Sequence, residues 1–304
     1  MTDRRHFLAT TATSMAALSL GTGARADESP TASDGTWLTY AVNVEMTWGN
    51  LPFLDRLRKV KEAGFSHYEF WPWRGKDLDA IKTLNDELGL HVAQFSAAPR
   101  GFARGFADPA RRDEFLEDIR LAVDVAKKLN VQKTCVVAGE EHEGLTKEQM
   151  TQSVIDCLKT AAPIVESAGI TLILEPLNVL VDHPRQHVVT SEHAARILKA
   201  VGSPNVKMLF DCYHQQISEG NLSGNIRKYK DLIGYYQIAD HPGRNQPGTG
   251  EVNYSHVFRV IHDVGYRGAI GLEMSASGDP MDAFKAVRKC DAEARDRRIG
   301  FKGR

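Results

Sequence analysis

Short apolar runs and longer amphipathic runs alternate eight times along this chain, between about residues 38 and 297. The apolar runs have strand length, and most amphipathic runs end at a glycine, as the run before Gly202 does. Glycine commonly follows the last turn of a helix. Eight strands alternating with eight helices over about 260 residues predict a single-domain α/β protein, a (β/α)8 TIM barrel. A doubly wound sheet is the alternative, but no G-x-G-x-x-G motif follows the first apolar run.

The predicted elements cover most of this region. The expected strands are 38–44, 67–70, 91–96, 131–137, 171–174, 206–210, 233–238 and 269–272. The expected helices are 51–63, 78–88, 109–129, 146–168, 191–201, 225–230, 254–264 and 281–297.

The N-terminal residues have a different character. Residues 1–26 place Arg4-Arg5 before a weakly apolar stretch at 9–20, which is followed by Ala24-Arg25-Ala26. This order resembles a twin-arginine signal peptide with a cleavage site, and predicts export to the periplasm. A membrane anchor is less favoured, because the stretch is shorter than the roughly 18 residues that span a bilayer. Residues 27–36 are expected to form a flexible lead-in, and residues 37–299 the barrel.

Composition narrows the range of partners. The chain carries 38 Lys and Arg residues against 39 Asp and Glu, a net charge of −1. A nucleic-acid partner would need a concentrated basic face, so none is expected. The four cysteines show no paired spacing and are interpreted as small buried or half-buried thiols rather than disulfides. A small-molecule substrate is favoured, no stable membrane insertion is expected after signal cleavage, and a homo-oligomer stays open.

Four oxygen-bearing side chains stand at the ends of four successive predicted strands: Glu175, Asp211, Gln237 and Glu273, at intervals of 36, 26 and 36 residues. The carboxyl ends of barrel strands form the face that carries the active site, so these side chains are expected to converge. Burying three carboxylates without a cation would be very unfavourable. Because all the donors are oxygen atoms, the pattern predicts a divalent metal site for Mg²⁺ or Mn²⁺. The alternative, that each acid caps a helix or pairs with arginine, is plausible for one of them but not for all.

Further polar residues are expected on the same face and are candidates for substrate binding: Glu69, Gln94, His214, His241 and Arg244. A structural role is the alternative for each histidine, and Glu69 and Gln94 could be hydrogen-bonded rim residues. Trp71 and Trp73 could form a sugar-binding wall or simply pack.

Several motifs around these residues resemble the hydroxypyruvate isomerase branch of the xylose isomerase-like barrels. The motifs are Glu175-Pro-Leu-Asn178, Phe210-Asp-Cys-Tyr-His214, Gln237-Ile-Ala-Asp240, Pro247-Gly-Thr-Gly-Glu-Val-Asn-Tyr254 and Gly271-Leu-Glu273. The resemblance implies that the four strand-end residues bind the metal and that Glu175 and Glu273 also form the acid/base pair. It also implies that His214 and Arg244 hold substrate oxygens. Gln237 stands where ketose epimerases usually have histidine, which favours the isomerase branch.

The functional hypothesis is a metal-dependent isomerase or epimerase that acts on a small hydroxy-carbonyl compound, hydroxypyruvate or a sugar, through an enediolate. A metal-independent glycoside hydrolase is one alternative, since two carboxylates suffice for that chemistry. A non-catalytic periplasmic sugar-binding barrel is another. Abasic-site endonucleases are disfavoured, because their multi-zinc sites need several histidines at strand ends, and the predicted strand ends lack them.

Overall fold

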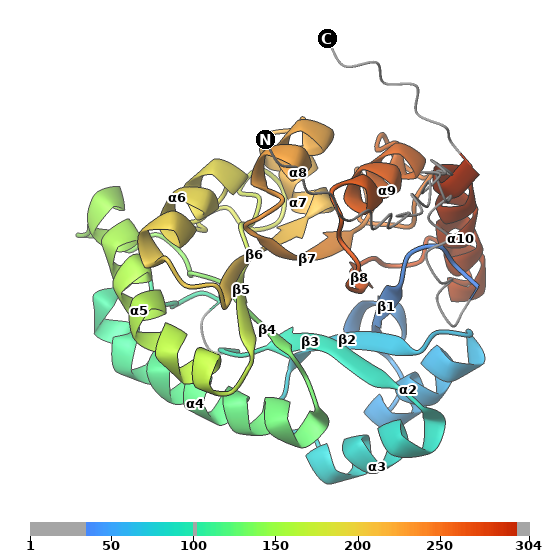
Figure 1. Cartoon of the computed structure of the whole chain (residues 1–304), viewed down its shortest axis with the longest axis horizontal. Coiled ribbons are helices and arrows are strands. Elements are labelled where there is room, and N and C mark those ends of the chain that lie inside the picture. Colours follow the sequence, from blue (N-terminus) through green and yellow to red (C-terminus); the bar gives the residue numbers. More distant parts are fainter. Residues whose placement is uncertain (1–34, 100–101, 297–304) are drawn as a thin grey trace, which may run out of the picture. The chain divides into compact units, whose positions relative to one another are not determined.

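A computed structural model describes residues 35–99 and 102–296, which belong to one compact unit. Eight parallel strands pair in chain order and close, β8 against β1, into a barrel that the longer helices surround (Figure 1). The predicted TIM barrel is therefore confirmed. The predicted signal peptide at 1–26 and nearly all of the lead-in at 27–36 lie outside the described residues.

The strands are β1 (Tyr40–Asn43), β2 (His67–Pro72), β3 (His91–Ser96), β4 (Lys133–Val136), β5 (Thr171–Leu174), β6 (Val206–Asp211), β7 (Ile233–Ile238) and β8 (Ile270–Leu272). The helices are α1 (Val44–Thr47), α2 (Phe53–Glu62), α3 (Leu78–Leu88), α4 (Arg112–Leu129), α5 (Lys147–Ser167), α6 (Ser191–Val201), α7 (Cys212–Ser218), α8 (Leu222–Tyr229), α9 (Tyr254–Asp263) and α10 (Pro280–Asp296). A 3₁₀ turn, η1 (Pro109–Arg111), precedes α4.

Short helices at the strand ends are the main departure from the predicted elements. Helices α1 and α7 begin directly after β1 and β6, and each is capped by the last polar residue of its strand. Asn43 accepts hydrogen bonds from two backbone N–H groups of α1, and Asp211 accepts one from Tyr213. Such caps satisfy the free N–H groups of a first turn. Helix α7 has only seven residues, too short a run for helical periodicity to show, so it was not predicted.

Side chains alternate between the two faces of each strand. Residues that face outward join the main hydrophobic core between the barrel and its helices. Ile173, Leu209 and Tyr235 form a separate small cluster with Cys135. Because side chains on a strand repeat every two residues, Glu175, Asp211 and Gln237 stand directly above this cluster. The polar strand-end residues therefore pack directly on this small apolar cluster inside the barrel.

No helix in the described ranges has the length and apolar character needed to cross a membrane. Cys135, Cys157 and Cys212 are buried thiols, as the cysteine spacing indicated.

Candidate metal centre

The carboxylates at the ends of β5, β6 and β8 meet at the mouth of the barrel. Glu175, Asp211, Glu273 and His214 each offer one ligand atom, and these atoms all lie within 4.8 Å of one another. All four residues are buried. Gln237 pairs with Asp211 in the β6–β7 register and lines a cavity at this mouth together with Glu175, His214 and Glu273. The structure therefore brings together the four residues that the strand-end pattern singled out.

Three oxygen atoms of this set are buried without a hydrogen-bond partner: Glu175 Oε1, Asp211 Oδ2 and Gln237 Oε1. Buried polar atoms nearly always have partners, so three such atoms at the ends of three neighbouring strands indicate a cation site. Each is a hard oxygen donor of the kind that Mg²⁺ and Mn²⁺ prefer. The residues present therefore fit a divalent metal ion.

The charges of the cluster support the same reading. Burial raises the pKa of Asp211 to about 8, and the neighbouring Glu273 carboxylate adds to the rise. Burial, then Glu273 and Asp211, also raise the pKa of Glu175 well above its usual value. Arg244 offsets part of the repulsion, because its Nη2 lies 2.6 Å from Glu273 Oε2 and 3.6 Å from Asp211 Oδ2. Three carboxylates against one guanidinium leave two negative charges, which a divalent cation would neutralise.

His214 is held in one tautomer by its neighbour Asn178. The side-chain oxygen of Asn178 accepts hydrogen bonds from the N–H groups of Val181 and Asp182, so its amide nitrogen must face His214. That nitrogen donates to His214 Nδ1 over 2.7 Å, which leaves the ring proton on Nε2. Burial lowers the pKa of His214 well below its usual value. His214 is thus a neutral hydrogen-bond donor, suited to a substrate oxygen.

Glu69 lies below the cavity, where it accepts four hydrogen bonds. Asn43 Nδ2 and Gln237 Nε2 donate to its Oε1, and Gln94 Nε2 and the Tyr235 hydroxyl donate to its Oε2. Burial, followed by Glu273, raises the pKa of Glu69 to about 7, while the donors from Gln237, Gln94 and Tyr235 act in the opposite direction. The two side-chain amides of Gln94 and Gln237 are thereby fixed to one carboxylate.

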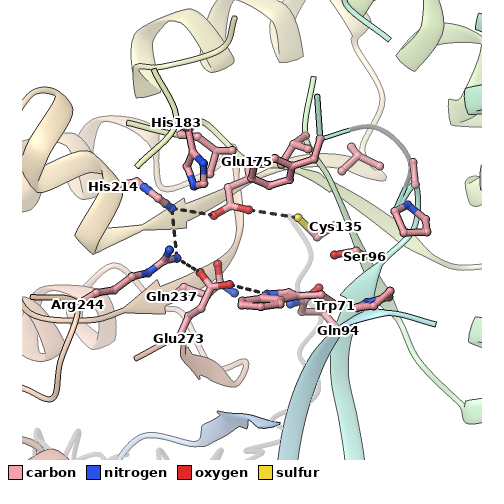
Figure 2. A pocket seen from close by; sticks show the side chains of 17 residues that line it. Trp71, Gln94, Ser96, Cys135, Glu175, His183, His214, Gln237, Arg244 and Glu273 are labelled. Atoms are coloured by element: carbon pink, nitrogen blue, oxygen red, sulfur yellow. Dashed lines mark hydrogen bonds and ion pairs between the residues drawn. The ribbon is translucent and has the colours of Figure 1, made fainter. Parts of the chain in front are cut away.

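The cavity above these residues has a volume of about 360 Å³. Figure 2 shows Glu175 and Glu273 entering it from different sides, each tied to a neighbour: Cys135, which the sequence did not predict as a site residue, and Trp71, which it left open between a sugar-binding wall and packing. Cys135 Sγ lies 3.5 Å from Glu175 Oε2, and Trp71 Nε1 donates to Glu273 Oε1 over 2.7 Å. The two-residue alternation along β2 and β4 is the signal that points to both.

Not every predicted substrate-binding residue reaches the cavity. Gln94, His214 and Arg244 line it, together with Trp71. Glu69 and His241 do not: Glu69 is fully enclosed beneath it, and the ring of His241 lies 5.9 Å from that of Tyr213. Trp73 points elsewhere and donates to the Ala97 carbonyl.

The sequence profile of the xylose isomerase-like TIM barrel matches residues 57–291 of this chain. The chain belongs to the xylose isomerase-like TIM-barrel family. Among family relatives, the hydroxypyruvate isomerase of Escherichia coli (strain K12) is 32% identical over 243 residues, which cover 78% of this chain and 93% of that protein. The 2-oxo-tetronate isomerase of Cupriavidus necator is 32% identical over 239 residues, covering 77% of this chain and 91% of that protein.

Solved structures of the family superpose well. A crystal structure described as AP endonuclease, family 2, from Brucella melitensis is 31% identical, with a TM-score of 0.77 over 81% of this chain and 96% of that one. The 3-keto-D-glucoside 4-epimerase of E. coli, at 23% identity, has a TM-score of 0.71 over 85% of this chain and 99% of that one, and shows the shared fold.

Proposed function

We propose that this chain is a divalent metal-dependent isomerase or epimerase that removes a proton next to the carbonyl of a small hydroxy-carbonyl compound and returns one at the neighbouring carbon or at the opposite face. The observation that carries the proposal is the buried cluster with three unpartnered ligand oxygens, on Glu175, Asp211 and Gln237. Membership of a family whose relatives are named isomerases, at 32% identity, supports the same activity.

The metal would be held by the four strand-end residues, Glu175, Asp211, Gln237 and Glu273. When bound, it supplies Lewis-acid polarisation of the substrate's carbonyl and hydroxyl oxygens. One glutamate of the pair Glu175 and Glu273 removes the proton from the carbon next to the carbonyl. The other returns a proton at the neighbouring carbon for isomerisation, or at the opposite face for epimerisation.

Neighbouring side chains prepare the two glutamates and the substrate for this transfer. Cys135 lies against Glu175 Oε2 and leaves Glu175 Oε1 for metal or proton, while Trp71 and Arg244 each hold one oxygen of Glu273. Arg244 Nη2 lies 3.3 Å from His214 Nε2, and both residues line the cavity, where they would donate to substrate oxygens that gain negative charge. We propose as substrate a compound of the hydroxypyruvate or 2-oxo-tetronate class, or a small sugar.

The experiment is proton exchange at carbon. Protein loaded with Mn²⁺ is incubated in D₂O with hydroxypyruvate, a four-carbon 2-oxo acid, ketoses and inososes, and deuterium incorporation is followed by NMR. EDTA should abolish incorporation and Mn²⁺ should restore it. Glu175→Gln and Glu273→Gln should abolish turnover while the circular dichroism spectrum stays unchanged. Turnover by Glu175→Gln would refute the assignment.

The same preparation distinguishes the alternative functions. A glycoside hydrolase would cleave aryl glycosides in the presence of EDTA. A sugar-binding barrel would bind ligand without deuterium incorporation. Nicking of abasic DNA would favour the activity in the description of the Brucella protein. Against that activity, His214 is the only histidine in the described ligand cluster.

We also propose that residues 1–26 direct export through the twin-arginine pathway, on the strength of Arg4-Arg5 and the Ala24-Arg25-Ala26 cleavage pattern. Cell fractionation tests it: the mature protein should appear in the periplasm, and the double substitution R4K/R5K should retain the full-length precursor inside the cell. A periplasmic product from that variant would refute the pathway.

A further inference from the structure

The carboxylate of Glu69 takes part in neither the metal cluster nor the cavity wall, although it lies beneath both. We propose that Glu69 is a positioning residue that orients the amides of Gln237 and Gln94, so that both carbonyl oxygens face the site. Gln237 Oε1 then serves the cation, and Gln94 Oε1 serves as acceptor for a substrate hydroxyl. This inference rests on the metal centre of the proposed function, but not on the reaction.

The orientation follows from what each group can accept. An ionised carboxylate has no proton to donate and only accepts, so an amide that touches it must present nitrogen. Gln237 Nε2 lies 2.8 Å from Glu69 Oε1, and Gln94 Nε2 lies 3.1 Å from Glu69 Oε2. The oxygens of both amides are therefore turned away from Glu69. Both are buried without a partner, and both residues line the cavity.

Glu69 is itself held rigidly. Asn43 donates to its Oε1 over 3.1 Å while the Asn43 oxygen caps helix α1, and the Tyr235 hydroxyl donates to its Oε2 over 2.8 Å. The hydrogen bonds from Asn43 and Tyr235 fix the Glu69 carboxylate in place. The amides of Gln237 and Gln94 therefore cannot rotate without losing their hydrogen bonds to Glu69. Asn43 on β1 and Tyr235 on β7 thus fix, through Glu69, the direction in which the Gln237 and Gln94 oxygens point.

Gly271 on β8 is a second, independent sign that the Glu69–Gln237 contact is required. A Cβ atom at position 271 would lie 2.5 Å from Glu69 Oε2 and 2.7 Å from Gln237 Cγ. Both distances are shorter than any real packing contact. Only glycine leaves room for the two side chains to meet across the inside of the barrel.

Glutamine at position 69 would no longer fix which end of the Gln237 amide faces the metal site. It presents one donor and one acceptor in place of two acceptors, so Gln237 can satisfy itself with either end of its amide. An orientation that points an N–H group at the cation then becomes accessible. Outer residues that orient metal ligands typically account for about 10- to 100-fold in metal affinity.

The test is calorimetric titration of the metal-free protein with Mn²⁺ alone, with thermal unfolding measured in parallel. Glu69→Gln should weaken Mn²⁺ binding by about 10- to 100-fold. The matched control is Tyr68→Phe, which removes the buried hydrogen bond to Asn85 from the adjacent position on the same strand. That variant should lose thermal stability and keep its Mn²⁺ affinity within about twofold.

The decisive experiment exchanges the carboxylate at position 69 with the amide at position 237. In the double variant E69Q/Q237E, the amide at position 69 donates to a carboxylate at position 237, which needs no orienting, and one oxygen remains for the metal. The single substitution Q237E would instead set two carboxylates at hydrogen-bonding distance, where they repel each other. The double variant should therefore bind Mn²⁺ more tightly than Glu69→Gln, by at least about fivefold, which yields a positive coupling in the double-mutant cycle.

Two results would overturn the inference: Mn²⁺ affinity of Glu69→Gln within about threefold of the parent protein, or no recovery in the double variant. If Glu69→Gln does not fold, Gly271→Ala tests the same contact, and unchanged Mn²⁺ affinity there overturns it. A parent protein that binds Mn²⁺ but exchanges no substrate proton would refute the isomerase and leave the role of Glu69 standing.

Discussion

Substituting Asp211 by asparagine should stabilise the metal-free protein and remove its response to metal. The side chain keeps its shape, and its Oδ1 can still accept from the Tyr213 N–H at the start of α7. The unpartnered Oδ2, which lies 3.6 Å from both His214 Nε2 and Arg244 Nη2, becomes an NH₂ group. The substitution removes one of three buried carboxylates, and with it the repulsion from Glu175 and Glu273.

The magnitude follows from the pKa of Asp211, which burial and Glu273 raise from 3.8 to about 8. Between these values the unfolded chain has released a proton that the folded chain retains, so stability falls as pH rises. At pH 7 the loss reaches about 4 kcal/mol, at about 1.4 kcal/mol for each pH unit above the ordinary pKa. The loss is absent below about pH 4 and fully developed above about pH 8. An asparagine side chain does not titrate, so the variant should lose the part of this slope that Asp211 contributes and keep the parts from Glu175 and Glu69, whose pKa values burial also raises.

The assay is urea unfolding followed by circular dichroism between about pH 4.5 and 8, with EDTA or with saturating Mn²⁺. In EDTA at pH 7 the variant should exceed the parent by up to about 4 kcal/mol, and the difference should shrink as the pH is lowered. In Mn²⁺ the order should reverse, because metal binding stabilises the folded parent protein. A metal-free variant that is less stable than the parent at pH 7, or that shares its pH slope, would contradict the reasoning.

Asp240→Asn is the matched control for that experiment. This buried carboxylate accepts hydrogen bonds from the backbone N–H groups of His241, Gly248, Gly250 and Val252. Each of its oxygens is therefore satisfied, unlike Asp211 Oδ2. An amide nitrogen in its place faces donors, so the variant should lose about 1–3 kcal/mol at every pH.

Three further substitutions separate substrate binding, glutamate positioning and folding. Arg244→Ala should raise KM at least about tenfold without weakening Mn²⁺ binding, because it removes a cation from beside the metal; weaker Mn²⁺ binding in calorimetry would contradict this. Trp71→Phe removes the 2.7 Å hydrogen bond to Glu273 and should lower kcat about tenfold, equivalent to about 1.4 kcal/mol, in steady-state kinetics at unchanged unfolding free energy. Asp291→Asn perturbs the contacts with the backbone of Trp37 and Leu38 and should cost about 1–3 kcal/mol in urea unfolding. An altered Mn²⁺ affinity in that variant would show that the N-terminal attachment reaches the site.

Much of the barrel was predictable from local sequence. Strands β3, β5 and β7 and helices α3 and α6 have the predicted bounds, because each has an apolar run of the right period and a clear end, such as Gly89 or Gly202. The residues at strand ends were predictable for the same reason, since the carboxyl ends of parallel strands share one face. Helix α7 was missed because its seven residues are too few for helical periodicity to show.

What each side chain of the site faces was not predictable in this way. Glu69 was a candidate for substrate contact, yet it lies under the proposed metal ligands, and His241 is not among the residues that line the cavity. Glu69 stands within β2, and His241 follows β7. Position along a strand therefore predicts the face but not the depth or direction of a side chain.

The sequence by itself determined the barrel, the face that carries the site, and the acids that meet there, because strand period, helix ends and strand order are local properties of a chain. Only the tertiary structure decided which oxygen of each residue is free. Gln237 is oriented by Glu69, 168 residues away, and His214 by Asn178, 36 residues away. Hydrogen-bond direction depends on which donors and acceptors are brought into contact, and distant strands make those contacts only once the barrel has closed.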